Sequence, residues 1–157
     1  MKKIFAFLFV TVLTLGAHAQ FERGTHYAGA NLTGLGIGYE KGNFSFGIGA
    51  EYGYYVADGW MVGATVGYRH LGDLNAVLIK PSFRYSFVQN GLNLGCGIQL
   101  EHAGSGLNYA QFCPQVGYTF YLNRNVSIEP AIYADICMNE PKNGSTVGLK
   151  IGFGLYK

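Results

Sequence analysis

Charge is what this sequence has least of. Only 13% of its 157 residues are charged, about half the share found in average soluble domains. Eleven basic and nine acidic residues leave a formal net charge of +2, and no block of Lys and Arg stands out along the chain. Recognition of a phosphate backbone requires concentrated positive charge. We therefore expect no nucleic-acid partner.

Long apolar runs and helical periodicity are missing as well. After residue 20, no stretch reaches the roughly 18 consecutive apolar residues of a transmembrane helix. Disorder is excluded because 49% of the residues are hydrophobic and 15% are aromatic, whereas disordered segments are poor in both. The length suits a single domain.

The first residues have the pattern of a secretory signal peptide. Lys2 and Lys3 precede an apolar run at 4–15, and small residues follow at 16–19, as in a cleavage site. A run of this length is too short to cross a bilayer. The sequence predicts a signal peptide over 1–19 and a single exported domain over 20–157. No cysteine follows the predicted cut directly, so no lipid anchor is expected.

The remainder of the chain alternates apolar and polar residues with the period of a β-strand. Turn residues separate the segments, and links this short join antiparallel neighbours, which predicts an up-and-down meander. A strand of about twelve residues tilted by about 40° rises roughly 30 Å, the thickness of a bilayer core. Links at 71–75, 103–108 and 139–144 are expected to be longer than the turns near Asp58, Asn90 and Arg124. The eight predicted strands are 26–39, 44–55, 61–70, 76–87, 92–102, 109–122, 126–138 and 145–156.

The two faces of these strands differ in chemistry. One face is apolar, and the other consists mainly of glycine and small polar residues, which accommodates many of the 24 glycines. The segment 26–39 fits less well, because Asn31 and Thr33 fall on the same face as Leu35, Ile37 and Tyr39. Aromatic residues gather near the strand ends of the apolar face, as at a membrane interface. They are Tyr39 and Phe44 at one rim, and Tyr52, Tyr54, Tyr85, Phe87, Tyr118, Phe120 and Phe153 towards the other.

Charged residues within the strands fall on the polar face, four acidic and four basic. Isolated charges are costly in a low-dielectric interior, whereas a paired set costs far less. An eight-stranded barrel is only just wide enough for its interior side chains, so the glycines provide room. We interpret the set as a static salt-bridged plug, with a gate or a proton path as the alternatives. The predicted interior network is Glu51, Arg69, Lys80, Arg84, Glu101, Glu129, Asp135 and Lys150.

A soluble β-sandwich or a soluble ligand-carrying barrel would show the same alternation. Three features favour the membrane: the polar face carries too little charge for a soluble surface, the aromatics lie at the strand ends, and the strands are long and even in number. The predicted fold is therefore an all-β, eight-stranded, antiparallel, up-and-down transmembrane β-barrel.

The chain resembles the small outer-membrane β-barrel family of OmpA/OmpX-like domains over residues 24–157. The likeness rests on the hairpin YYVADGWMVGATVGY (54–68), the strand KPSFRYSF (80–87), the segment YTFYLNRNVSIEPAIY (118–133) and a strand that ends at the C-terminus. The resemblance implies the outer membrane of a Gram-negative-type cell, with the lipid bilayer, the barrel-assembly machinery and periplasmic chaperones as partners.

The resemblance also implies an assembly signal in the last strand, carried by Gly148, Ile151 and Phe153 after Thr146. Family members usually finish on an outward aromatic. Here Lys157 follows Tyr156, and Tyr156 has inward parity, so the last strand departs from the family pattern.

The cysteines offer no clear site. Cys96 has lipid-facing parity, while Cys113 and Cys137 point inward from adjacent strands about two residues out of register. A disulfide between them would be strained, and we expect free thiols.

No catalytic, cofactor-binding or metal-binding residues are predicted, because the histidines lack metal-ligand spacing and nothing assembles a nucleophile with its base. The favoured function is that of a non-enzymatic, monomeric barrel with a structural role in the envelope. The alternatives are transport of a small solute or an apolar ligand, and a lipid-modifying enzyme.

Overall fold

The computed structural model describes residues 21–33, 45–71, 74–103, 108–138 and 145–157. The predicted signal peptide, Tyr39 and Phe44 lie outside this described part. Within it, no helix has the length and apolarity needed to span a membrane. The strands are β1 (His26–Thr33), β2 (Ser45–Ala57), β3 (Trp60–Leu71), β4 (Leu74–Ser86), β5 (Leu92–Ala103), β6 (Asn108–Phe112), β7 (Gln115–Tyr118), β8 (Phe120–Tyr121), β9 (Val126–Cys137) and β10 (Thr146–Tyr156).

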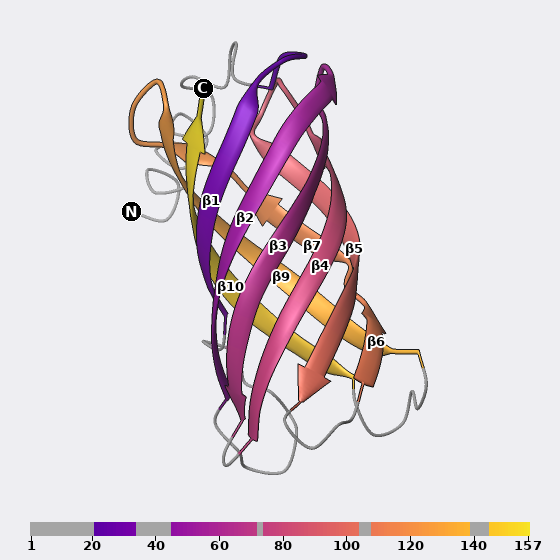
Figure 1. The fold of residues 1–157 in the computed structure, drawn as a ribbon. Helices are drawn as coiled ribbons and strands as arrows, with labels where there is room; N and C mark the ends of the chain where they lie inside the picture. The colour runs from indigo at the N-terminus through magenta and orange to yellow at the C-terminus, as the bar shows by residue number, and fades with distance from the viewer. Residues whose placement is uncertain (1–20, 34–44, 72–73, 104–107, 139–144) are drawn as a thin grey trace, which may run out of the picture.

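These strands form an antiparallel sheet that closes on itself (Figure 1). Each strand pairs with its neighbours along the chain, and β10 then pairs with β1 from Tyr27↔Tyr156 to Thr33↔Lys150. Among the described strands, closure gives each strand a neighbour on both sides, as a membrane requires of a spanning sheet. With β6, β7 and β8 counted as one interrupted strand, the described strands make a ring of eight. The predicted barrel is confirmed.

The single strand predicted at 109–122 is wrong in one respect, because it is divided into β6, β7 and β8. Pro114 has no N–H to donate to the ladder, and the strand assignment stops beside it. The register nevertheless continues across the interruption, with Phe112 opposite Ile136 and Gln115 opposite Tyr133. The three pieces therefore follow one path in the wall of the barrel.

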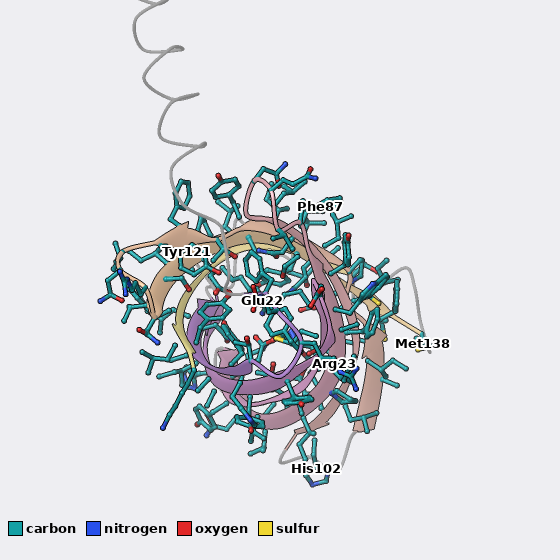
Figure 2. All side chains as sticks on the ribbon, turned by 90° about the horizontal axis from the view of Figure 1, so that it is seen from above. Glu22, Arg23, Phe87, His102, Tyr121 and Met138 are labelled. Atoms are coloured by element: carbon teal, nitrogen blue, oxygen red, sulfur yellow. The ribbon has the colours of Figure 1, made fainter. Side chains whose placement is uncertain are left out.

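The apolar face of the strands lies on the outside. Ile48 is 52% exposed and Val66 is 56% exposed, although both lie within strands. Figure 2 shows side chains radiating outward around the ring. Large apolar side chains left this exposed over a whole surface indicate a lipid environment rather than water.

The face predicted for the first strand is wrong for its described part. Asn31 is buried inside the barrel, whereas Leu32 is exposed outside it. The pairing of β1 with both β2 and β10 fixes this register, and it places Ala28 and Ala30 on the outside.

Tight turns connect the strands at one end of the barrel, which we call the short-turn end. They join β2 to β3, β4 to β5 and β8 to β9. Gly59 and Gly91 have positive φ angles of 77° and 75° in the first two turns, a conformation that other residues adopt at a cost. The link expected to be longer at 71–75 is in fact short, because Leu71 still pairs with Leu74.

Candidate functional site

The centre of the barrel holds an ion cluster around Arg84. Arg84 is 3% exposed, and its two terminal nitrogens donate to different carboxylates. Nη2 lies 2.8 Å from Glu51 Oε1, and Nη1 lies 2.9 Å from Glu129 Oε2. The guanidinium carbon also sits 4.8 Å from the centre of the Tyr27 ring, a cation–π distance. One cation therefore bridges two acids from β2 and β9.

Glu129 is held by four donors. The Tyr27 hydroxyl and Arg84 donate to its Oε2, while the hydroxyls of Ser127 and Tyr156 donate to Oε1 at 2.8 and 2.6 Å. A buried carboxylate needs this degree of hydrogen bonding to offset its lost hydration. We call Arg84, Glu51, Glu129, Tyr27 and Tyr156 the inner cluster.

The space for the inner cluster comes partly from glycine. A Cβ at Gly154 would lie 2.6 Å from both Glu129 Oε1 and Ser127 Oγ. A side chain at this position would have to displace the carboxylate or the hydroxyl, so the glycine on β10 provides room for the carboxylate on β9.

A second ion cluster lies further from the short-turn end, around Arg69. Arg69 Nη2 is 3.0 Å from Asp135 Oδ2, and Nη1 is 3.4 Å from Glu101 Oε2. Gln99 donates through Nε2 to Glu101 and to Gln111 Oε1. We call Arg69, Asp135 and Glu101 the outer cluster. Like the inner cluster, it has one arginine and two carboxylates.

The two interior lysines border the clusters without an ion pair to either, and Lys150 lines a small cavity with Arg84, Glu51 and Glu129. Lys150 donates to Gln115 Oε1 at 2.5 Å, and Lys80 has no hydrogen bond to any described residue. Neither has a carboxylate within 4.0 Å among the described residues. Both line a small cavity together with Arg69, Asp135, Gln99 and Thr65. The eight predicted charges thus separate into two arginine-centred clusters and two lysines.

The short-turn end is filled by an aromatic cluster that the sequence did not predict. Phe21 is 0% exposed, and its ring centre lies 5.8 Å from that of Tyr55 and 5.9 Å from those of Tyr121 and Tyr156. Met61 and Tyr27 complete this cluster. The inward parity of Tyr55, Met61 and Tyr156 signals it in the sequence, but Phe21 precedes the first strand and has no periodic signal.

The backbone holds the segment 21–25 across this end of the barrel. Gly59 N donates to Phe21 O at 2.7 Å, and Gly24 N donates to Tyr55 O at 2.8 Å. Arg23 N donates to Asp58 Oδ1. Glu22 and Arg23 lie over the opening of the ring in Figure 2. We call residues 21–25 the cap.

The cysteines lie where the parity of the strands places them. Cys96 is exposed on the outside, and Cys113 and Cys137 are buried inside. Gln111 pairs with Cys137, so Cys113 is offset from Cys137 by the two residues expected. All three thiols are free. Among the described residues, no three His, Cys, Asp or Glu side chains gather as metal ligands would.

The residues of the implied assembly signal occupy both faces of β10. Gly148 is buried inside, Phe153 is 47% exposed on the outside, and Ile151 is half-buried. Tyr156 is buried at 3% exposure within the aromatic cluster. The aromatic residue near the C-terminus therefore faces the lumen, and Phe153 is the last aromatic residue that faces outward.

The sequence matches the outer membrane protein beta-barrel domain family over residues 5–156. The chain belongs to this family. Membership of this family places the chain in the outer membrane, within a lipid bilayer. This location agrees with the exposed apolar side chains on the outside of the barrel. A comparison with curated protein sequences finds no significant match.

The fold of this chain is similar to solved structures of small outer-membrane barrels. The N-terminal β-barrel domain of Pseudomonas aeruginosa OprF shares 15% identity with a TM-score of 0.65, covering 85% of this chain and 98% of that domain. Neisserial surface protein A shares 15% identity with a TM-score of 0.60, covering 83% and 94%. A de novo designed transmembrane β-barrel shares 13% identity with a TM-score of 0.56, covering 88% and 100%. Likeness at this level of identity shows the fold alone.

Proposed function

We propose that this barrel is a closed, non-enzymatic, monomeric component of the outer membrane with a structural role in the envelope. The observation that carries the proposal is the filling of the lumen. The inner cluster spans the interior with buried ion pairs at 2.8 and 2.9 Å, and the cap places Phe21 across the short-turn end. An eight-stranded barrel has little room beside such side chains.

The proposal includes the route to the membrane. Cleavage after Ala19 would release the signal peptide, and periplasmic chaperones and the barrel-assembly machinery would then insert the chain. The pattern at Gly148, Ile151 and Phe153 supports recognition of the last strand. The short-turn end would face the periplasm, as is usual for such barrels.

Conductance in planar bilayers tests the proposal. The purified barrel, refolded in detergent and reconstituted, should give no reproducible channel steps under conditions in which a reconstituted porin conducts. A variant that replaces Arg84, Glu51 and Glu129 by Ser serves as the comparison, because it empties the inner cluster. Discrete channels from the unchanged barrel would contradict the structural role and favour transport of a small solute.

Enzymatic activity on lipids requires a separate measurement. Mass spectrometry of outer-membrane lipids from cells with and without the gene should give the same profile. A lipid species that depends on the gene would contradict the non-enzymatic assignment.

A further inference from the structure

The cavity beside the outer cluster has more positive than negative charge around it. Its lining includes Arg69, Lys80 and Lys150 but only one carboxylate, that of Asp135. Glu101 adds a second carboxylate through its ion pair with Arg69. Around this cavity alone, three cations and two anions leave a charge of +1. A further carboxylate, Glu51, lies opposite Thr65 in the β2–β3 pairing and is paired with Arg84.

The two lysines have more N–H donors than the acceptors that they contact in this cavity. Each ammonium has three N–H donors. Lys150 directs one of them to Gln115, and Lys80 has no carboxylate within 4.0 Å among the described residues. Lys150 is 6% exposed, and an ammonium group removed from water in this way needs a counter-charge close by.

A buried hydroxyl without a partner points to the same place. Thr65 lines the cavity, is 2% exposed and lies directly opposite Lys80 in the β3–β4 pairing. Its Oγ1 has no hydrogen-bond partner within the described residues. Such orphaned groups are rare in proteins and usually belong to a bound water or ion.

We propose that Lys80, Lys150 and Thr65 bind one halide-sized monovalent anion, with chloride as the natural occupant. The open space is sufficient for only one or two water molecules, so a monatomic anion fits, whereas a phosphate or an organic acid does not. The anion accepts hydrogen bonds from both ammonium groups and from the Thr65 hydroxyl, and it offsets the excess of positive charge in the cavity lining.

Bromide tests the site directly on the unchanged protein. Crystals of the full chain grown in bromide should give an anomalous difference peak within hydrogen-bond distance of Lys80 Nζ and Lys150 Nζ. Density without an anomalous signal there would identify water and overturn the proposal, and so would an empty cavity. Because this experiment uses no variant, it does not depend on whether a variant folds.

A solution measurement separates a genuine site from binding at crystal concentration only. The thermal unfolding midpoint of the detergent-folded barrel should be higher in chloride or bromide than in gluconate at the same ionic strength, since a ligand of the folded state raises stability. Lys80→Met and Thr65→Val should lose this halide-dependent rise. Lys157→Met, at the exposed end of the chain, should keep it. Equal midpoints in all three salts for the unchanged barrel would overturn the proposal.

Discussion

Arg84 is the residue on which the interior depends most. It is almost completely buried, and it neutralises one acid from β2 and one from β9 at once. Removing one member of a buried ion set is costly because its partners keep their charge without a counter-ion. The effect should therefore exceed the loss of two hydrogen bonds.

We predict that Arg84→Met lowers the free energy of unfolding by about 3–5 kcal/mol. Urea titration in detergent micelles, followed by the shift of the folded band on a gel, measures the loss. Arg124→Met, in the exposed turn between β8 and β9, should leave stability within about 0.5 kcal/mol. Adding Glu51→Gln and Glu129→Gln to Arg84→Met should restore part of the loss. Equal stability of the two single variants would contradict the prediction.

The individual charges could be located from the sequence, but their partners could not. Strand parity places Arg69, Lys80 and Arg84 on one face because the β period is two. Which acid each arginine contacts depends on register and side-chain reach, which parity does not contain. Glu129 and Arg84 are separated by 45 residues in the chain and meet only across the lumen.

At the scale of the strands, the regular ladder of backbone hydrogen bonds is interrupted at turns and at prolines. Proline occurs inside three described strand paths, at Pro81, Pro114 and Pro130. The β4–β5 pairing has no partner for Pro81, although it is regular on both sides. The sequence predicted long, continuous strands because an alternating pattern passes through a proline unchanged. The loss of a ladder hydrogen bond does not alter that pattern.

Gly59 provides the sharpest prediction for the turns. Its φ angle is +77° and an added Cβ would lie 2.7 Å from Ser86 O, so Gly59→Ala should lower the free energy of unfolding by more than about 1 kcal/mol. Gly152→Ala is the matched control, because its added Cβ would meet nothing closer than 3.5 Å. Urea titration of both variants in the same detergent measures the difference. Equal losses would mean that neither the strain nor the contact at Gly59 matters.

At the scale of the whole molecule, the barrel presents an apolar wall that ends in aromatic rings. Trp60 is the chain's one tryptophan. It lies at the short-turn end, 42% exposed, with its ring centre 4.5 Å from that of Tyr85. Aromatic rings of this kind settle at the level of the lipid headgroups. The tryptophan therefore reports the depth of the barrel in the membrane.

In vesicles, we predict that Trp60 fluorescence is quenched more by lipids brominated near the headgroup than by lipids brominated near the tail end. The matched control combines Trp60→Phe with Ile132→Trp. Ile132 is 58% exposed at the middle of β9, so the order of quenching should reverse. Quenching by an aqueous quencher alone would place Trp60 in water and contradict the membrane assignment.

The architecture could be predicted from the sequence because every described strand except the first shows a clear apolar face and a clear polar face. The small outward residues of the first strand, Ala28 and Ala30, gave too weak an apolar signal to fix its face, and only pairing with both neighbours does so. The position of the cap could not be predicted from the sequence, because a segment without periodicity does not indicate where it packs.

The position of Phe21 also sets an order of events during assembly. The rings that receive it, Tyr55, Tyr121 and Tyr156, come from the second strand, the interrupted sixth and the last. The complete pocket requires that the last strand has joined the first, because Tyr156 comes from the last strand. Although Phe21 lies early in the sequence, we therefore expect its full burial to accompany closure of the barrel.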